Sequence, residues 1–228
     1  MIKFSYIVPT ICKFPRLEEQ LTKIGNTECI DEIIIVNNSG GLQIPQIQTK
    51  APVIEITPKE PSFCNGAWNI GAEAAKNDYI IISTEDLIYD ANVLNMIAEQ
   101  IDKLPNLGVL GMDWNIASDH CPPLESIWMQ EAGTQREYGF GFMMFMKKIN
   151  FTPIPSGVKQ WYGDDFTYYM MLERGLKNYI IKSDSFRIET VAGSMCYSEE
   201  TKARIESDKI YWRANYYDKF TKYGTRCG

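Results

Sequence analysis

The chain has 228 residues, of which 45% are hydrophobic and 23% are charged. This composition is typical of a globular domain and excludes disorder as the main state of the chain. Lys and Arg together number 23 against 29 Asp and Glu, so the net charge is −6. The overall field of such a chain does not attract nucleic acid, although a local basic patch would still allow it to bind.

The N-terminal residues MIKFSYIVPT contain no long apolar run followed by a small-residue cleavage site. No stretch of the chain approaches the roughly 20 apolar residues of a membrane span. The six cysteines are scattered without a CxxC pair, which favours reduced thiols and a cytoplasmic protein. His120 is the single histidine and lies in a predicted loop, so a metal site with several histidines is excluded.

The first half of the chain alternates continuous apolar runs with segments of helical periodicity. The predicted strands are residues 4–8, 33–36, 53–56 and 79–83. The predicted helices are residues 16–24, 65–75 and 91–104. Apolar strands that alternate with helices indicate an α/β fold, in which a mostly parallel sheet has helices on both faces.

The second half has a less regular pattern. Residues 112–139 resemble a loop, and the apolar residues 140–146 predict a strand. Further candidates are a helix over residues 164–174, strands over residues 179–181 and 186–189, and a closing helix over residues 201–223. We therefore expect one α/β domain over residues 1–198, with a mixed second half from residue 113, followed by a C-terminal helix within residues 199–228.

Several common catalytic motifs are missing from the sequence. There is no GxxxxGK[ST] and no GxSxG, and GFGF at residues 139–142 lacks the third glycine of a dinucleotide fingerprint. The remaining candidates are carboxylates near the ends of predicted elements. Ligands of a parallel sheet bind beyond the carboxyl ends of its strands.

Glu85 and Asp86 directly follow the predicted strand of residues 79–83. Carboxylate oxygens suit Mg²⁺ or Mn²⁺, and such an ion commonly binds a diphosphate. Alternatively, the two residues form a solvated acidic turn that caps the next helix. The residue chemistry alone leaves both interpretations open.

A second acidic pair, Asp164 and Asp165, opens a predicted helix and follows Trp161 and Tyr162. Carboxylates in the first turn of a helix often serve only as a cap and as partners of the helix dipole. Aromatic side chains beside a carboxylate are also a usual way to hold a sugar. Both roles remain open for this pair.

Asn65 and Asn69 are four residues apart and share one face of a predicted helix. Near a helix N-terminus their amides can reach ligand oxygens. The alternative is an N-cap at Asn65, with glycine and alanine residues around it that serve only close packing.

The order of these motifs resembles the inverting glycosyltransferases of family 2, which have a GT-A fold. The motifs are VPT, VNNSG, NGAWNIGAEAAKNDYIIISTED, GFGFMMFMKK and WYGDDF, and the resemblance covers most of residues 3–190. It implies transfer of a sugar from a nucleoside-diphosphate sugar to an acceptor hydroxyl with inversion, assisted by Mn²⁺ or Mg²⁺. Residues 1–112 would then be the donor-binding half and residues 113–198 the acceptor half.

The resemblance also implies a role for individual residues on the donor side. Asp86 would be the metal ligand, and Glu85 would lie at the ribose or the metal. The other donor-binding residues would be Pro9, Thr10, Asn37, Asn38, Asn65 and Asn69. The chain departs from the family pattern at Asn37, where an Asp is usual, and at Trp68, where an Arg is frequent.

On the acceptor side, the resemblance makes Asp165 the catalytic base, with Asp164 as its acidic neighbour. The acceptor-binding residues would be Gly141, Phe142, Trp161 and Tyr162. The acceptor hydroxyl could belong to a glycan, a small molecule or a modified nucleic acid. Two alternatives are a nucleotidyltransferase on a similar sheet, although VPTICKFPR lacks the glycine of its usual phosphate loop, and a non-catalytic nucleotide- or sugar-binding module.

The C-terminal segment is richer in positive charge than the rest of the chain. Residues 199–226 carry a net charge of +2 and many interleaved aromatic residues. The favoured interpretation is a helix packed on the domain. The alternatives are a lid over the diphosphate and a patch for a polyanionic acceptor such as modified DNA.

Overall fold

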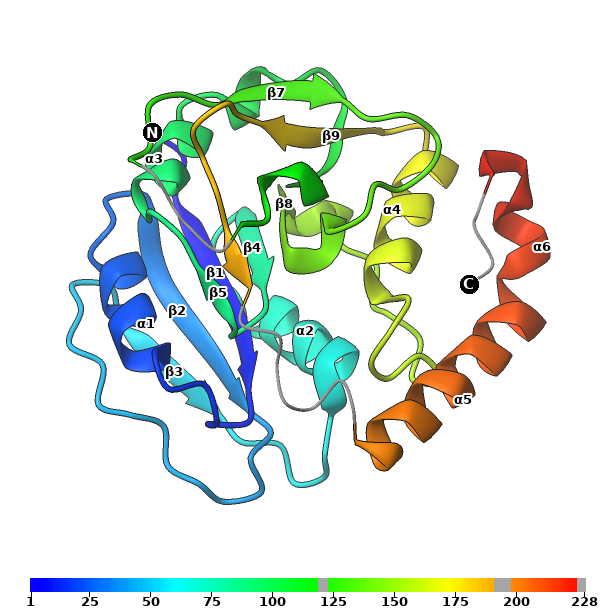
Figure 1. The fold of residues 1–228 in the computed structure, drawn as a ribbon, viewed down its shortest axis with the longest axis horizontal. Helices are drawn as coiled ribbons and strands as arrows, with labels where there is room; N and C mark the ends of the chain where they lie inside the picture. The colour runs from blue at the N-terminus through cyan, green and yellow to red at the C-terminus, as the bar shows by residue number, and fades with distance from the viewer. Residues whose placement is uncertain (119–122, 191–197, 225–228) are drawn as a thin grey trace.

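The computed structural model describes residues 1–118, 123–190 and 198–224 of the chain (Figure 1). His120 and the cysteines Cys121, Cys196 and Cys227 lie outside these ranges. The strands of the main sheet are β1 (Phe4–Thr10), β2 (Ile30–Asn37), β3 (Val53–Ile56), β4 (Tyr79–Ser83), β6 (Leu107–Met112), β7 (Trp128–Glu131), β8 (Met143–Lys147) and β9 (Lys177–Lys182). The helices are α1 (Leu17–Gly25), α2 (Phe63–Ala74), α3 (Asn92–Ala98), α4 (Gly163–Glu173), α5 (Glu199–Asn215) and α6 (Tyr217–Phe220).

The main sheet has eight strands in the order β3-β2-β1-β4-β8-β6-β9-β7. Strands β1 to β4 run parallel to one another, and β6 runs parallel to β9. Strand β8 is antiparallel to β4 and β6, and β7 is antiparallel to β9. A second sheet of two strands pairs β5 (Leu87–Ile88) with β10 (Glu189–Thr190). The prediction of a mostly parallel α/β sheet with a mixed second half is therefore confirmed.

Helices cover both faces of the sheet, as the alternation of side chains along each strand requires. Tyr6 and Val8 of β1 belong to the core that also contains apolar residues of α1 and α3. Ile7 points to the opposite core, which is shared with α2, α4, α5 and α6. Gly71 of α2 lies so close to β1 that an added Cβ would overlap the Ile7 side chain. This contact explains why a glycine stands at position 71 of α2.

The predicted strands of the first half lie where the apolar runs are, but the second half contains strands that the pattern did not reveal. Strand β7 lies within residues 112–139, which resembled a loop. Strand β6, which ends where that segment begins, was not predicted either. The four residues of β7 at the sheet edge are mostly exposed, so they carry no hydrophobic signal. Two predicted elements are also shorter than expected: residues 91–104 become α3 followed by a 3-10 turn at Ile101–Lys103, and Phe140–Phe142 form another 3-10 turn before β8.

The C-terminal segment packs against α4 (Figure 1). It does not form one continuous helix, because the helix is interrupted at Tyr216, between α5 and α6. The Trp212 ring stacks on Tyr162 with centroids 5.1 Å apart, and Phe220 stacks on Tyr169 at 5.2 Å. Because Trp212 and Phe220 are buried, these contacts agree with the interpretation of a packed helix. The division of the chain at residue 198 stays a prediction. Within the described residues, no helix is both long enough and apolar enough to cross a membrane.

Candidate active site

The carboxyl ends of β1 and β4 meet at Glu85, which lies two residues after the end of β4. The Thr10 hydroxyl donates a hydrogen bond to Oε2 of Glu85, and the backbone N–H of Ile11 donates to Oε1 at 3.2 Å. Pairing of β1 with β4 ends at Ile7, before Pro9, and so leaves room for this carboxylate between the two strands. Burial raises the pKa of Glu85, and its bonds to Thr10 and Ile11 oppose that rise.

Asn38, just beyond β2, connects this strand end with the start of α2. Its backbone N–H donates to the carbonyl of Thr10 at 2.7 Å, and its Nδ2 donates to the carbonyl of Phe63 at 3.1 Å. Its Oδ1 accepts hydrogen bonds from the N–H and the hydroxyl of Ser62. Asn38 therefore fixes the N-terminus of α2 beside the ends of β1 and β2.

Asn37, the last residue of β2, is 3% exposed and organises the turn that follows it. Its Nδ2 donates to the carbonyl of Leu42 at 2.8 Å and to Oε1 of Glu55 at 2.7 Å. Its Oδ1 accepts the N–H of Ser39 at 3.0 Å. Asn37 therefore holds the turn after β2, and its contact with the nucleoside stays a prediction.

Asn65 and Asn69 hold the segment that leads to the acidic pair. The Asn65 amide donates to the carbonyls of Val158 and Trp161 at 3.1 and 3.0 Å. The Asn69 amide exchanges two hydrogen bonds of 2.8 Å with the backbone of Ile154. The alternative of an N-cap at Asn65 is wrong, because α2 begins at Phe63 and Ser62 precedes it. The observed contacts of both asparagines are structural, and the donor-binding role stays a prediction.

Asp164 and Asp165 lie in the first turn of α4, where Arg136 bridges them. The Arg136 Nε and Nη2 donate to the two oxygens of Asp165 at 2.7 and 3.2 Å. Its Nη1 lies 3.1 Å from Oδ2 of Asp164. Helix α4 begins at Gly163 and Tyr162 is its N-cap residue, so neither carboxylate is the N-cap, and both lie in the first turn beside the positive end of the helix dipole.

The environment of Asp165 perturbs the proton affinity of its carboxylate. Burial and the neighbouring charge of Asp164 raise the pKa of Asp165 to about 6, although Arg136 opposes the rise. Burial and the charge of Asp165 also raise the pKa of Tyr169, one turn further along α4, to about 12. Perturbed groups of this kind cluster at functional sites.

The four residues predicted to bind the acceptor differ in their contacts and in their exposure to solvent. Gly141 packs against Asp164 so closely that an added Cβ would lie 2.6 Å from its Oδ2. The carbonyl of Phe142 accepts the N–H of Thr84 at 3.3 Å and so connects this turn with the end of β4. Trp161 is 51% exposed, whereas Tyr162 is half-buried and stacks on Trp212. Trp161 thus offers its ring to solvent, and Tyr162 fills the core beside it.

Cys64 shows that the two acidic groups share one region. The thiol lies in the first turn of α2, and burial followed by the charges of Asp86, Asp164 and Glu85 raises its pKa. The end of β4 and the start of α4 therefore both lie within electrostatic range of this helix N-terminus. Sequence reasoning missed Cys64 because no motif marks it.

Sequence reasoning also missed Arg136 and Asp208. Arg136 is 29 residues away from Asp165 in a segment that was predicted to be a loop. Asp208 of α5 is fully buried, and its carboxylate accepts the backbone N–H groups of Lys159, Gln160 and Trp161 at 2.9, 2.6 and 2.9 Å. The surrounding charges of residues 199–226 gave no sign that this carboxylate points inward.

The donor set at the end of β4 fits a divalent cation. Mg²⁺ and Mn²⁺ are commonly held by one or two carboxylates and completed by water and substrate phosphates. Asp86 is half-buried, while both oxygens of Glu85 are already hydrogen-bonded. Within residues 1–118, 123–190 and 198–224, no three His, Cys, Asp or Glu side chains form a group that could hold a metal. Asp86 is thus the side chain here that would hold a metal together with a diphosphate.

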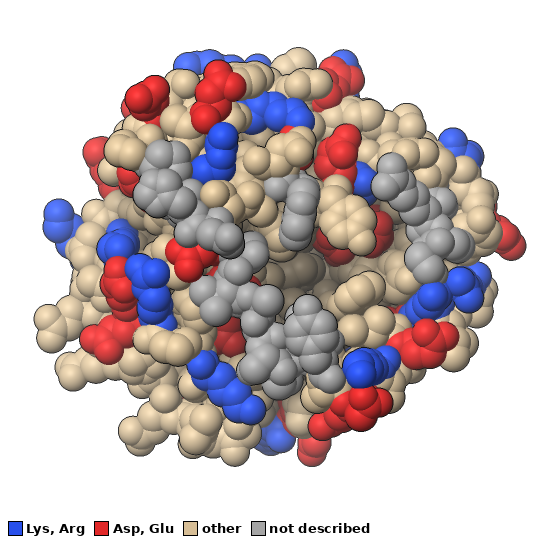
Figure 2. Space-filling model, viewed as in Figure 1, with Lys and Arg blue, Asp and Glu red and all other residues tan. Residues whose placement is uncertain are grey.

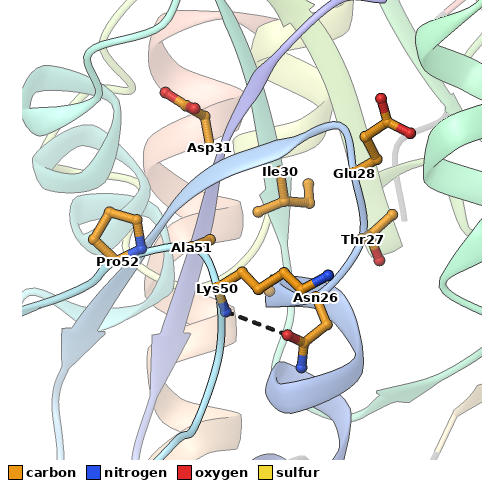
Figure 3. A pocket seen from close by; sticks show the side chains of 9 residues that line it. Asn26, Thr27, Glu28, Ile30, Asp31, Lys50, Ala51 and Pro52 are labelled. Atoms are coloured by element: carbon orange, nitrogen blue, oxygen red, sulfur yellow. Dashed lines mark hydrogen bonds between the residues drawn. The ribbon is translucent and has the colours of Figure 1, made fainter.

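Two surface cavities lie at the other end of the strands. One has a volume of about 520 Å³, and Asn26, Ile30, Lys50 and Pro52 are among the residues that line it (Figure 3). The other has a volume of about 500 Å³ and shares Asn26, Thr27 and Glu28 with the first. The first cavity adjoins the starts of β2 and β3, and the second adjoins the starts of β2 and α3, so neither includes Glu85 or Asp165. Figure 2 shows a hollow near the centre of the face seen in Figure 1, with carboxylates around it.

The family model described as Glycosyl transferase family 2 matches residues 5–151. No curated protein matches the chain.

The similar solved structures share the fold at low sequence identity. S. aureus TarS, solved alone and with UDP, is 13% identical, with 95% of this chain and 74% of that chain covered and a TM-score of 0.59. GalNAc-T7 with UDP, GalNAc and Mn²⁺ is 12% identical, with 97% of this chain and 50% of that chain covered and a TM-score of 0.63. The family match spans more than half of the 228 residues, and the observed sheet agrees with that of the GT-A neighbours. The chain therefore belongs to glycosyl transferase family 2 and is a glycosyltransferase with a GT-A fold.

Proposed function

We propose that this glycosyltransferase takes a sugar from a nucleoside-diphosphate donor and transfers it to an acceptor hydroxyl with inversion of the anomeric carbon. One observation carries the proposal: the turn at Phe140–Phe142 contacts both acidic sites, because Gly141 packs against Asp164 and the carbonyl of Phe142 accepts the N–H of Thr84, next to Glu85. A metal-and-diphosphate group and a base are the two requirements of this reaction.

The donor that we propose is a uridine diphosphate sugar. TarS has been solved with UDP and with UDP-GlcNAc, and GalNAc-T7 with UDP. In this chain the nucleoside would contact Pro9, Thr10, Asn37 and Asn38, and Glu85 would lie at the ribose. Asn65 and Asn69 would then act near the donor mainly by holding residues 154–161 on α2.

Asp86 would hold Mn²⁺ or Mg²⁺ against the diphosphate. When bound, the ion offsets the negative charge that develops on the departing diphosphate. The GalNAc-T7 structure contains Mn²⁺, and the carboxylate at the end of β4 is a suitable oxygen ligand for it.

Asp165 would act as the base in a single displacement. Its carboxylate removes the proton of the acceptor hydroxyl while the acceptor oxygen attacks the anomeric carbon. The bond between that carbon and the diphosphate oxygen breaks, and the nucleoside diphosphate leaves with the bonding electrons. Attack from the face opposite to the leaving group inverts the carbon.

The acceptor would lie over Gly141 and Phe142, beside Trp161. The exposed ring of Trp161 can cover one face of an acceptor, whereas Tyr162 supports the site from the core. A glycan, a small molecule and a modified nucleic acid all remain acceptor classes to be tested. A cytoplasmic location likewise remains a proposal, which fractionation of cells that express a tagged chain would test.

A binding screen followed by an activity assay tests this function. Thermal unfolding is measured with UDP, UDP-GlcNAc and UDP-glucose, each with and without Mn²⁺. A ligand at about 100 times its dissociation constant adds about 2.7 kcal/mol of stability, which is easily measured. We expect a Mn²⁺-dependent shift, followed by release of UDP from the sugar that binds. Binding without any release, across a panel of acceptors, would support a non-catalytic module instead.

A further inference from the structure

Arg136 makes the most extensive charged contact around the proposed base. Its guanidinium donates from Nε and Nη2 to both oxygens of Asp165, in the bidentate geometry that guanidinium and carboxylate groups favour. The third nitrogen, Nη1, contacts Asp164 at 3.1 Å and also donates to the carbonyl of Glu137 at 3.0 Å. All three charged side chains are about a fifth exposed, so water screens them only in part.

The charges around Asp165 are unbalanced without this arginine. Asp164 and Tyr169 face it from α4 itself, Arg136 faces it from the segment after β7, and Cys64 of α2 lies near Asp164. Arg136 is the cation in this group, and Asp164 and Asp165 are adjacent carboxylates. Two carboxylates that share one site resist ionising together unless a positive charge lies beside them.

We propose that Arg136 is a positioning residue of the transfer reaction, which orients the Asp165 carboxylate and supplies the positive charge that favours its ionised form beside Asp164. This inference rests on the proposed role of Asp165 as the base. Each carboxylate oxygen has two lone pairs, and Arg136 uses one on each oxygen of Asp165. The two bonds from Arg136 leave acceptor capacity on these oxygens, and the side chain is 17% exposed, so an acceptor hydroxyl can reach it. Once Asp165 takes up the proton, Arg136 still pairs with Asp164, so the cation stays compensated.

A titration of folding stability tests the charge role without any substrate. In the wild type the pKa of Asp165 in the folded state, about 6, lies above the value of about 3.9 for an unperturbed Asp. The stabilisation that this group contributes is therefore present below pH 4 and is lost as the pH rises through about 6. In R136M the loss should extend to higher pH, by about 1 unit or more, since an adjacent cation typically shifts a carboxyl by 1–3 units.

The measurement is the unfolding midpoint from pH 4 to 9, with Asp165→Asn in each background to isolate the step that belongs to Asp165. R136K keeps the charge and should restore the wild-type step. R16M is the matched control, because Arg16 pairs with Glu19 on the surface of α1. If the step in R136M lies at the wild-type pH, or if the step in R136K moves as far as that in R136M, the proposal is overturned. If R136M does not fold, R136K and R136Q give the same comparison.

The activity assay then separates orientation from charge. With UDP-GlcNAc and Mn²⁺, the acidic limb of the pH profile for UDP release should move to higher pH in R136M. R136K should keep the wild-type limb but lose about 10-fold or more in kcat, with KM for UDP-GlcNAc unchanged, because a lysine cannot hold both oxygens in the plane of a guanidinium. If R136M and R136K both lose kcat and both raise KM for UDP-GlcNAc to the same extent, the positioning role is contradicted. If the wild type releases no UDP, the proposed function fails with this donor, while the stability titration still decides the charge role of Arg136.

Discussion

The buried carboxylate of Asp208 accepts the backbone N–H of Trp161 at 2.9 Å, although 47 residues separate them in the chain. The same carboxylate accepts the N–H groups of Lys159 and Gln160. Trp161 is three residues before Asp164, so α5 fixes the backbone that leads into the acidic pair. The C-terminal segment thereby supports the site through its contacts with residues 159–161.

Replacement of Asp208 by Asn should destabilise the chain, because an amide NH₂ cannot accept the bonds that one carboxylate oxygen now receives. A buried donor without an acceptor costs about 1–3 kcal/mol, and bonds to a charged group cost more. Denaturant unfolding of D208N checks this expectation, with Asp102→Asn on the exposed surface as control. A D208N chain with wild-type stability would contradict the inward role of this carboxylate.

Removal of residues 199–228 should expose the apolar face of α4 and cause aggregation. The segment contributes the buried rings of Trp212 and Phe220, which stack on Tyr162 and Tyr169. Truncation of one such aromatic to Ala already costs about 3–5 kcal/mol. Size-exclusion chromatography of the shortened chain and of W212A checks the result, with R213A at an exposed position as control. A monomeric shortened chain with an unchanged melting temperature would show that the segment is not structural.

Asp86→Ala should remove the Mn²⁺ dependence of nucleotide binding while the melting temperature stays close to that of the wild type. Asp86 is half-buried at a strand end, so its loss empties no core. Isothermal titration of UDP with and without Mn²⁺ measures the effect. Unchanged affinity and metal dependence would show that Asp86 is not the ligand.

Glu85→Ala should behave differently from Asp86→Ala and lower the melting temperature. It would leave the Thr10 hydroxyl and the Ile11 N–H without the carboxylate that now joins β1 to the end of β4. The expected loss is about 1–3 kcal/mol, the cost of unsatisfied buried groups. Glu85→Gln keeps the size and one acceptor oxygen for the Ile11 N–H, while its NH₂ can donate to the Thr10 hydroxyl oxygen, so it serves as the matched control in the same melting experiment. Equal melting of all three chains would rule out a structural role for Glu85.

Asp165→Asn should reduce transfer by about 10²–10⁴-fold, the usual contribution of a general base, while donor binding stays near normal. Asp164→Asn should retain more activity, because Asp164 is not the proposed base and contacts Arg136 through a single nitrogen. Both variants are compared with one donor and one acceptor, with affinity for UDP as the control for folding. Wild-type turnover of D165N would assign the base to another residue.

The parallel half of the fold could be predicted from the sequence because its signals are local. Continuous apolar runs, such as those of β2 and β4, and the turns that follow them report burial on both sides of a sheet. The order of the motifs also indicated the family. The position of Thr10, Glu85 and Asp86 near strand ends predicted that they lie at the carboxyl edge of the parallel sheet, and Thr10 and Glu85 are hydrogen-bonded there.

The contacts that organise the acidic pair were decided only by tertiary structure. Arg136 reaches Asp165 across 29 residues, and Asp208 reaches Trp161 across 47. Neither residue differs in type or spacing from an exposed charge, and β7, which leads to Arg136, is too exposed to carry a hydrophobic pattern. Whether a carboxylate lies in solvent or receives three backbone N–H groups depends on where a distant segment packs, and a local pattern holds no information about that.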